Sequence, residues 1–339
     1  MKNETFINKI ICADSLQLLP KIESDSIDLV LTDPPYFLDK MDNHWNHRTV
    51  SNLTDYCHVV KSLPPGMKFD KEQGKRFYDW YFRIAKELHR VLKPGGFFFS
   101  FSSPRLYHRM VSAVDDAGFL IRDCFIWLYT QNQPKGMSLN HFIDKLEPDE
   151  GIRIKLKEKL NGWKTPQLKS CFEPIVMAQK ECDGTFLNNM QKHKVGLTNT
   201  NIKIGNNMFP ANVVTTQKIN EIIDKCFLLP KPTKEEKGDF NIHQTVKPLA
   251  LCEYLLKLTT FSGNAVVLDP FVGSGTTAVA AKSLGRKFIG IDSNREYVEI
   301  ALRRLGDTEE AENQEYAIGR ANRQFTLFES KRKYLIRKK

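Results

Sequence analysis

The sequence predicts an α/β fold in which helices cover both faces of a doubly wound, mostly parallel sheet. Three observations indicate this class. Short apolar runs with the length of buried strands recur along the chain, segments of helical period separate them, and two of the runs end at an aspartate followed by a turn. With 339 residues, the chain can form one large domain of this kind with an insertion, or two smaller domains.

Strands and helices are expected to alternate in the amino-terminal part of the chain. A strand over residues 9–13 ends at Asp14 and Ser15, and Ser15 is expected to cap a helix over 16–22. The next strand is buried and ends at Asp33. Residues 37–75 mix polar and aromatic residues around a Pro-Pro-Gly break, which indicates a loop. The other elements expected here are a helix over 77–92 that stops at residues 93–96, a strand over 97–101, a helix over 104–117 and a strand over 121–129.

The rest of the chain contains two irregular stretches before the alternation resumes. A basic insertion separates the strand over 121–129 from a returning strand over 174–179, and residues 181–244 are polar, rich in Asn and Lys, and expected to be irregular. From Lys247 onward the expected elements are a helix to residue 260, a strand over 265–269, a helix over 276–284, a strand over 287–292 and a helix over 295–305.

The net charge of +10 favours a polyanionic partner such as nucleic acid. Basic residues recur between Lys145 and Lys203 with Trp163 among them, whereas the basic run near the carboxyl terminus reads as a solvated tail.

Composition also indicates the compartment. No apolar run reaches membrane-spanning length and the first residues are polar, so we expect a cytoplasmic protein without a membrane partner. The seven cysteines are scattered, which is typical of reduced thiols. We expect no metal site, although His44, His47 and His58 lie close to Cys57 in the sequence.

The first chemical motif is Asp33-Pro34-Pro35-Tyr36, at the carboxyl end of a buried strand. Open α/β sheets bind ligands at this edge. The two prolines have fixed φ and stiffen the turn, so a carboxylate, a free carbonyl group and an aromatic ring share one rigid corner. Such a corner suits a planar group that carries an amino group. The alternative is a strand end with a tight turn and a half-buried tyrosine.

The second motif runs from Asp269 to Thr277 and contains a Phe-x-Gly-x-Gly turn between a strand and a helix. Glycines let a ligand approach the backbone, and the start of a helix offers free N–H groups. The missing Gly-Lys-Ser/Thr argues against a phosphate-binding loop, and the dinucleotide fingerprint lacks its third glycine. Asp292 ends the next strand, where a carboxylate binds ribose hydroxyls. We therefore predict an adenosine-bearing cofactor without pyrophosphate; the alternative is a structural turn.

Together these motifs resemble the S-adenosylmethionine-dependent amino-methyltransferases that act on DNA. Two further landmarks match, His243-Gln244-Thr245-Val246-Lys247-Pro248 and the stretch over 90–96. The catalytic corner precedes the cofactor corner, which is similar to the β class of these enzymes, and the likeness extends from about Asn8 to Leu305. The resemblance implies a permuted Rossmann-like methyltransferase fold. It divides the chain into a catalytic half (1–130), a target-recognition insertion (131–240), a cofactor half (241–306) and a carboxyl-terminal tail (307–339).

The resemblance also implies a binding site for S-adenosylmethionine. Asp292 would bind the ribose, Asp14 and Ser15 would face the adenine ring, and Asp269 would lie near the amino-acid end. Lys247 would pair with the carboxylate of the methionine portion; alternatively, it is a lysine at a helix start. The full set of residues implied for the cofactor is Asp14, Ser15, Asp33, Thr245, Lys247, Asp269, Phe271, Gly273, Ser274, Gly275, Thr276 and Asp292.

The implied reaction is methylation of the exocyclic amino group of a base flipped out of double-stranded DNA, with Asp33, Pro34, Pro35 and Tyr36 as the catalytic residues. Asp33 favours adenine, and cytosine is the alternative. Two other readings are a catalytically silent DNA-binding protein and an amino-methyltransferase for RNA or protein.

Residues 131–237 are expected to contact DNA, with a lid over 39–69, and a cognate restriction endonuclease and a homodimer are further expected partners. Candidate base readers are Gln131, Asn132, Gln133 and residues 199–207.

Overall fold

The computed structural model of the chain describes residues 3–36, 71–128, 137–165, 171–202, 209–215, 227–228, 240–241, 246–261 and 263–306. Within these ranges nine strands form one sheet, in the order β1-β9-β8-β2-β3-β5-β4-β6-β7. β5 is antiparallel to its neighbours β3 and β4, and the other pairings are parallel. The strands are β1 (Lys9–Cys12), β2 (Ile27–Thr32), β3 (Leu92–Phe101), β4 (Leu120–Leu128), β5 (Phe172–Gln179), β6 (Val213–Thr215), β7 (Phe227–Leu228), β8 (Val266–Asp269) and β9 (Lys287–Asp292).

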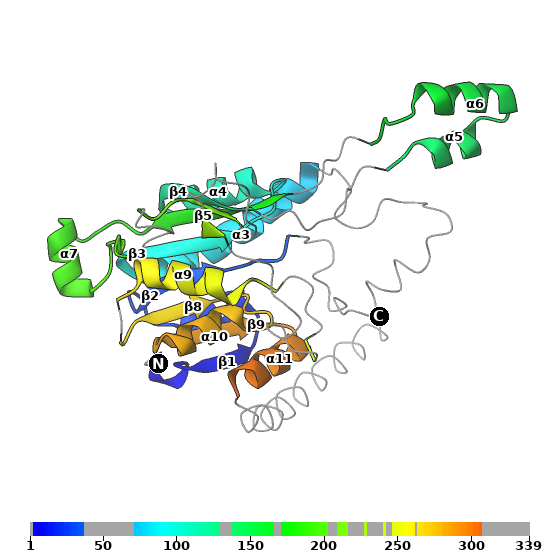
Figure 1. Cartoon of the computed structure of the whole chain (residues 1–339). Coiled ribbons are helices and arrows are strands. Elements are labelled where there is room, and N and C mark those ends of the chain that lie inside the picture. The colour runs from blue at the N-terminus through cyan, green and yellow to red at the C-terminus, as the bar shows by residue number, and fades with distance from the viewer. Residues whose placement is uncertain are drawn as a thin grey trace, which may run out of the picture.

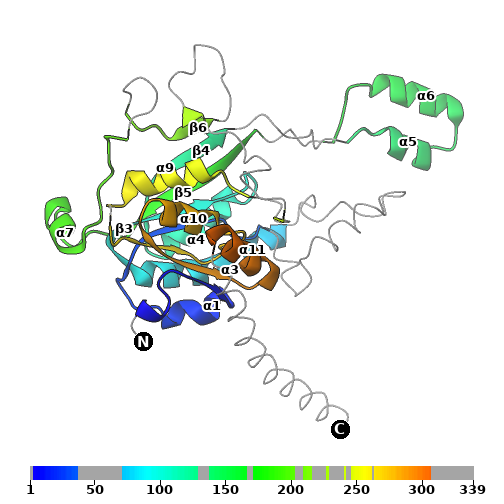
Figure 2. The same cartoon turned by 60° about the horizontal axis from the view of Figure 1, so that its bottom comes forward.

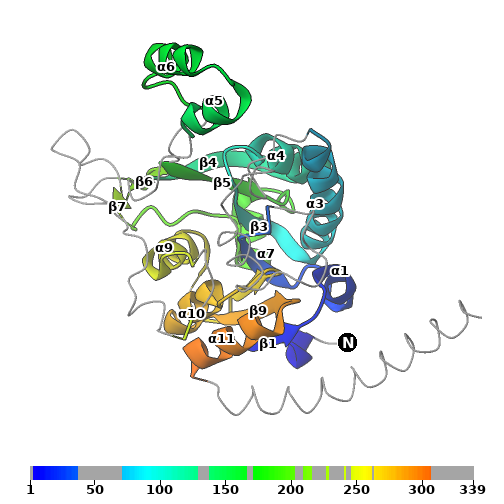
Figure 3. The same cartoon turned by 90° about the vertical axis from the view of Figure 1, so that its right-hand side faces the viewer.

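Helices cover both faces of this sheet. α1, α3 and α4 lie on one face, and α9, α10 and α11 lie on the other (Figure 3). The predicted α/β class with a doubly wound, mostly parallel sheet is therefore confirmed. The helices are α1 (Ser15–Leu18), α3 (Lys71–Val91), α4 (Tyr107–Asp116), α5 (Asn140–Leu146), α6 (Glu150–Lys159), α7 (Phe186–His193), α9 (Leu249–Thr259), α10 (Thr276–Ser283) and α11 (Arg295–Leu305), with short 3-10 turns at Asn3–Thr5 and Leu19–Lys21.

The side chains of β2 contribute to two hydrophobic cores, one on each face of the sheet. Leu29 and Leu31 pack with residues of α9 and α10, whereas Val30 packs with residues of α3 and α4. This division follows from the two-residue period of a strand. Every residue of β2 is buried, as expected for a central strand covered on both sides.

At the centre of the sheet, a strand from the amino-terminal part of the sequence lies beside a strand from its carboxyl-terminal part. β2 pairs in parallel with β8, so the carboxyl ends of both strands meet at one edge. The chain after β8 enters α10 on one face, and α3, the next described helix after β2, lies on the other face (Figure 1). In doubly wound sheets this reversal leaves a crevice between the two strand ends, and ligands bind there.

The basic insertion contains a helical hairpin formed by α5 and α6. It stands away from the sheet (Figure 1 and Figure 2), and its base is closed by a bridge between Ser138 and Lys164. An ion pair of 2.5 Å between Lys157 and Asp144 joins the two helices. The hairpin thus projects between β4 and β5 and has internal contacts of its own.

α3 ends before residues 93–96, as the sequence predicts, but these residues belong to β3, which begins earlier than the predicted strand over 97–101. The helix ends at Val91 and β3 begins at Leu92. Gly95 has a φ of +79° and donates its N–H to the carbonyl oxygens of Lys180 and Glu181, just beyond the end of β5. Backbone hydrogen bonds to residues next to a distant strand therefore hold this Pro-Gly-Gly sequence in β3. Such a tertiary contact cannot be predicted from the local sequence.

The segment over 181–244, expected to be irregular, contains α7 and the short strands β6 and β7. Thr185 caps α7 by accepting a hydrogen bond of 3.2 Å from the N–H of Asn188. Asn189 is fully buried and donates to the carbonyl oxygens of Pro94 and Val195. One buried asparagine therefore holds the helix against the start of β3.

The cap of α1 also differs from the expectation. Asp14, not Ser15, is the N-cap, and its carboxylate accepts a hydrogen bond of 2.7 Å from the N–H of Leu16. The Ser15 hydroxyl donates instead to the carbonyl oxygen of Pro270. The capping interaction thus falls one residue earlier than predicted, and Ser15 connects α1 to the turn after β8.

Candidate active site

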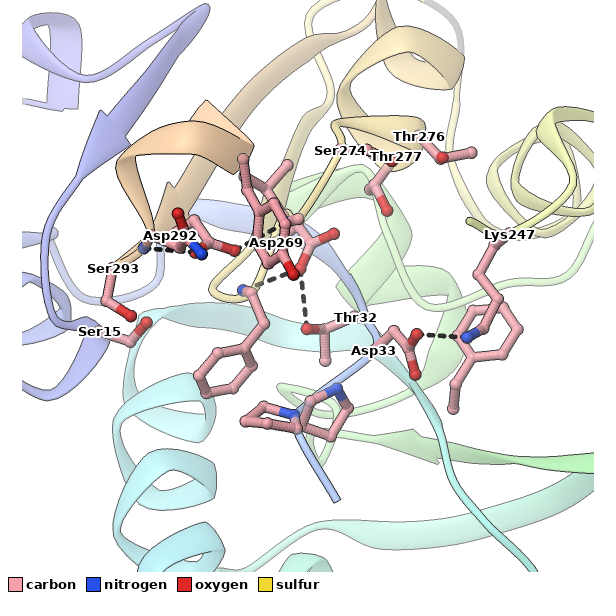
Figure 4. Close-up of a pocket in the computed structure, with 18 of the residues that line it drawn as sticks. Ser15, Thr32, Asp33, Lys247, Asp269, Ser274, Thr276, Thr277, Asp292 and Ser293 are labelled. Atoms are coloured by element: carbon pink, nitrogen blue, oxygen red, sulfur yellow. Dashed lines mark hydrogen bonds and ion pairs between the residues drawn. The ribbon is translucent and has the colours of Figure 1, made fainter. Parts of the chain in front are cut away.

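A pocket of about 520 Å³ opens at the carboxyl ends of β1, β2, β8 and β9. Its size lies within the range of small-molecule sites. Both chemical motifs of the sequence meet in it, although they lie more than 200 residues apart (Figure 4). The lining residues are Asp14, Ser15, Leu16, Thr32, Asp33, Pro34, Pro35, Tyr36, Trp80, Ile84, Phe101, Val246, Lys247, Cys252, Asp269, Phe271, Val272, Gly273, Ser274, Thr276, Thr277, Asp292, Ser293, Asn294, Arg295, Glu296 and Tyr297.

The first corner places a carboxylate and a tyrosine against each other. Asp33 follows directly on β2, and one of its oxygens accepts a hydrogen bond from the Tyr36 hydroxyl. Burial, followed by the charges of Asp33 and Glu173, raises the pKa of Tyr36 well above its ordinary value. Tyr36 therefore stays a neutral hydrogen-bond donor to Asp33. Pro34 is buried and Pro35 is half-buried beside them.

Lys247 occupies the other oxygen of Asp33. Its ammonium group forms an ion pair with Asp33, lies 3.4 Å from Oε2 of Glu173, and sits 5.0 Å from the centre of the Phe101 ring. Burial alone would lower the pKa of this lysine, but the two carboxylates outweigh burial and raise it. Lys247 is 6% exposed. Lys247 directly precedes Pro248, the N-cap of α9, so it stands at a helix start, as one of the two expectations has it. In the ligand-free protein its ammonium group is held by Asp33, and pairing with the carboxylate of a ligand stays a prediction.

Asp269 ties the second corner to the first. Its Oδ1 accepts hydrogen bonds of 2.8 Å from the Thr32 hydroxyl, at the end of β2, and of 3.0 Å from the N–H of Phe271. Burial raises the pKa of Asp269 to about 7, although hydrogen bonds from Thr32, Thr277 and Phe271 favour the charged form. The protonation of this carboxyl group therefore changes near neutral pH in the ligand-free protein.

Asp292 orients the glycine turn from the end of β9. Its carboxylate accepts hydrogen bonds of 2.9 Å from the N–H of Gly273 and of 2.8 Å from the N–H of Asn294. Burial raises the pKa of Asp292 to about 6, against the effect of these two N–H groups. The carboxylate is thereby fixed at the pocket wall.

Gly275 has a packing role and does not line the pocket, in contrast to the expectation for this turn. Its φ is +86°, and a Cβ atom there would lie 2.8 Å from Cβ of Ala301 in α11. The glycine thus allows α10 and α11 to approach closely. Ser274 and Thr276 do line the pocket, and Nη1 of Arg304 donates to the Ser274 carbonyl and the Thr276 hydroxyl at 2.9 Å each.

The remaining walls combine an aromatic surface with an acidic one. Trp80 of α3 and Phe271 lie 5.4 Å apart between ring centres, and Asp14, Ser15 and the start of α11 complete the pocket near Asp292. Carboxylates predominate among the charged lining groups, and Lys247 is already engaged by Asp33. A pocket of this composition disfavours phosphate and suits a partly aromatic ligand that carries positive charge.

Several residues of the sequence interpretation lie outside the described ranges. They include Thr245, the lid over 39–69, the histidines near Cys57, and Gln131, Asn132 and Gln133. Asn199 is described, and its N–H donates to the carbonyl oxygen of Leu258 at 2.7 Å. In the described part of the chain, no group of His, Cys, Asp and Glu side chains could hold a metal ion, and no helix is both long and apolar enough to cross a membrane.

Glu173 and Phe101 are site residues that sequence reasoning did not identify. Phe101 ends β3, within the strand predicted over 97–101, whereas Glu173 lies near the start of β5, one residue before the strand predicted over 174–179. Because β5 is antiparallel, its start lies beside the end of β3, where Phe101 pairs with Ile175. A charged residue at the start of an otherwise apolar strand was the available signal, and it could be used only once the direction of β5 was known.

Comparison with known proteins places these features in a family. The profile of a family described as DNA methylase matches residues 27–303. The chain is 30% identical to the type II methyltransferase M.HindIII of Haemophilus influenzae over 315 residues, which cover 88% of this chain and 96% of that protein. It is 29% identical to the type II methyltransferase M2.DpnII of Streptococcus pneumoniae, over 91% of this chain and 92% of that protein.

A third relative and one solved structure extend the comparison. The DNA adenine methyltransferase YhdJ of Escherichia coli is 26% identical over 87% of this chain and 82% of that protein. The structure of the PvuII DNA methyltransferase, described as cytosine-N4-specific, superposes with a TM-score of 0.51 at 17% identity, over 87% of this chain and 85% of that one. At this identity the structural likeness concerns the fold alone.

Proposed function

This chain belongs to the DNA methylase family, and we propose that it transfers a methyl group from S-adenosylmethionine to the exocyclic amino group of adenine in double-stranded DNA. The main support for this proposal is that the Asp33 corner and the Asp269–Asp292 corner line the same pocket. A hydrogen bond of 2.8 Å from Thr32 to Asp269 connects them directly. A group bound at one corner therefore lies next to a group bound at the other.

The composition of the pocket fits S-adenosylmethionine, which carries an adenosine and a net positive charge. Asp292 would hold the ribose hydroxyls, Asp14 and Ser15 would border the adenine ring, and Asp269 would lie near the amino-acid end. When bound, this molecule supplies a methyl group whose bond to sulfur breaks with both electrons remaining on sulfur. The raised pKa values of Asp269 and Asp292 support this assignment, because a cation would stabilise the ionised form of carboxyl groups that are costly to ionise in the empty pocket.

The Asp33 corner would hold the target amino group. Such a nitrogen is a poor nucleophile because its lone pair is delocalised into the ring. Hydrogen bonds from its two protons to Asp33 and to the Pro34 carbonyl would localise the lone pair, and the negative charge would stabilise the positive charge that develops on nitrogen. The nitrogen forms its new bond to carbon with that lone pair and is positive until a proton leaves to water. The amino group would replace the Tyr36 hydroxyl at Asp33, which frees the ring to stack on the base.

Adenine is favoured as the target by two facts. An aspartate occupies the first position of the corner, and a relative that covers most of the chain is named a DNA adenine methyltransferase. Relatives named type II methyltransferases also support a restriction endonuclease as a functional partner. A homodimer remains a prediction from the sequence.

Residues 131–240 would form the target-recognition region, between a catalytic half (1–130) and a cofactor half (241–306), with 307–339 as a tail. The projecting hairpin supports this division, because α6 presents Lys155 and Lys159 as exposed basic side chains. Neutralisation of phosphates by such residues releases counterions, so binding to DNA would be strongly salt dependent. The target base would leave the helix to reach the pocket, at a cost of about a few kcal/mol.

The test is a methyl-transfer assay on plasmid DNA from a host that lacks DNA methylation, with S-adenosylmethionine labelled in its methyl group. After digestion to nucleosides, we expect the label in N6-methyladenine, and none with an Asp33→Ala control. Label in N4-methylcytosine would overturn the assignment of the base. Binding of DNA without any transfer would support the catalytically silent reading and overturn the proposed function.

A further inference from the structure

A single buried ammonium group is shared by two carboxylates behind the catalytic corner. Nζ of Lys247 forms an ion pair with Asp33 and lies 3.4 Å from Oε2 of Glu173. The side chain of Lys247 is 7% exposed, that of Asp33 19%, and that of Glu173 23%. Asp33 faces the pocket, whereas Glu173 is not among the lining residues. Glu173 therefore acts on the site through Lys247 and not by contact with a ligand.

The surroundings keep this cluster in place. The Phe101 ring lies 5.0 Å from Nζ of Lys247, and the backbone beside it is fixed because the N–H of Ser102 donates to the carbonyl oxygen of Pro174 at 2.9 Å. That bond joins the end of β3 to the start of β5, next to Glu173. Both carboxylates contribute to the raised pKa of Lys247, so the lysine stays charged.

The charges of the cluster sum to one negative charge. Asp33 and Glu173 each contribute one negative charge and Lys247 contributes one positive charge. Without Glu173, the pair of Lys247 and Asp33 would be neutral. Because the three side chains are largely buried, a net charge of this kind acts more strongly here than it would in solvent.

We infer that Glu173 is a positioning residue for methyl transfer: it balances Lys247, so that Asp33 keeps the negative charge that stabilises the methylated amino nitrogen of the target base. This inference rests on the proposed function, in which that nitrogen becomes positive in the transition state. Lys247 holds the Asp33 carboxylate in one orientation, and Glu173 prevents that same lysine from cancelling the charge of Asp33.

The first test replaces Glu173 by Gln, which keeps the shape of the side chain and an oxygen that accepts from Lys247 but removes the charge. We expect the single-turnover rate of methyl transfer to fall about 100-fold, comparable to the loss of one preorganised charge-stabilising group. The affinity for S-adenosylmethionine should stay within about threefold, because Glu173 does not line the pocket. Glu173→Asp retains the charge and should keep the rate within about tenfold of wild type.

The decisive test adds Lys247→Met to Glu173→Gln. The double variant again has one negative charge, on Asp33, so it should transfer methyl about tenfold faster than Glu173→Gln alone, provided that it binds S-adenosylmethionine. A purely structural role for Glu173 predicts the reverse, because the second substitution removes further contacts. Glu253→Gln is the matched control, since Glu253 forms an ion pair of 3.7 Å with Lys257 away from the pocket.

All variants are compared on the same unmethylated plasmid DNA, with thermal unfolding as a check of folding. A Glu173→Gln rate equal to wild type would overturn the inference, and so would a double variant no faster than Glu173→Gln. If the double variant does not fold, a Glu173→Asp rate as low as that of Glu173→Gln overturns it. If the wild-type chain transfers no methyl group, the proposed function itself fails, which is a distinct result.

Discussion

The affinity for S-adenosylmethionine should fall steeply as the pH is lowered from about 7.5 to about 5. Asp269 and Asp292 line the pocket, and burial raises their pKa values to about 7 and about 6. A ligand with a net positive charge binds best when both carboxyl groups are ionised. At a pH below either pKa value, the corresponding carboxyl group is therefore protonated, and it must lose that proton before the ligand binds.

The size of the effect follows from the two pKa values. If only the doubly ionised pocket binds, the affinity falls about tenfold per pH unit below the pKa of Asp269 and about 100-fold per unit below that of Asp292. Between pH values of about 7.5 and 5 the loss would approach about 10³-fold. The ligand does not contribute over most of this range, since an α-amino group has a pKa of about 7.7–8.0.

Isothermal titration calorimetry of the wild-type protein across this pH range measures the effect directly. S-adenosylhomocysteine, which lacks the sulfonium charge, should show a weaker pH dependence. Asp269→Asn should remove the upper part of the dependence, because its amide oxygen can still accept from Thr32 and Phe271 while the titrating group is gone. An affinity that is unchanged between pH 7.5 and 5 in the wild-type protein would refute the view that these carboxylates face a cationic ligand.

The stability of the ligand-free protein should show the opposite trend at this site. Folding raises the pKa of Asp269 to about 7, so this carboxyl group binds a proton more tightly in the folded state than in the unfolded state. Its contribution to stability is therefore greatest at low pH and is lost as the pH rises through about 7. Relative to wild type, Asp269→Asn should gain stability above this pH, as measured by the unfolding temperature without ligand. Equal shifts at pH 5 and pH 8 would contradict the raised pKa.

Three further predictions concern the catalytic corner, the glycine turn and the hairpin. Asp33→Ala should lower the single-turnover rate by at least about 10³-fold while cofactor affinity, measured by calorimetry, stays within about threefold; transfer near the wild-type rate would remove Asp33 from the mechanism. Gly275→Ala should cost about 3 kcal/mol in urea unfolding, because a positive φ costs about 1–2 kcal/mol and the clash with Ala301 adds to it. Gly285→Ala, whose φ is +67° in open space, should cost only about 1 kcal/mol, and equal losses would mean that packing against α11 is unimportant. Replacing the exposed Lys155 and Lys159 together by Gln should reduce the slope of log affinity for DNA against log salt by about 2, and an unchanged slope would exclude α6 from the phosphate contacts.

Local patterns predicted most of the central fold. The bounds of β9 and α11 agree with the sequence prediction, because each element has an uninterrupted period and a clear start and stop. The shared pocket was predictable for a similar reason. Asp33, Asp269 and Asp292 each end a parallel strand, and parallel strands present their carboxyl ends at one edge of the sheet.

The partners within the site were not predictable, since they depend on contacts between distant segments. The ion pair of Lys247 with Asp33 spans 214 positions, and no spacing in the sequence encodes it. The same limit explains α7, whose C-cap is Lys194 with a left-handed φ of 61°, where glycine is the usual stop signal. Packing of Asn189 against β3 stabilises that helix, and local propensity does not report such packing.

The adjacency of β2 and β8 has a consequence for how this protein is made. β2 leaves the ribosome early, yet its hydrogen-bonding partner on one side begins at Val266, more than 200 residues later. At translation rates of about 5–20 residues per second, that apolar strand waits roughly 10 to 50 s with one edge unpaired. Nascent chains should therefore require protection by chaperones until the last quarter of the polypeptide has emerged, and fragments that stop before β8 should aggregate.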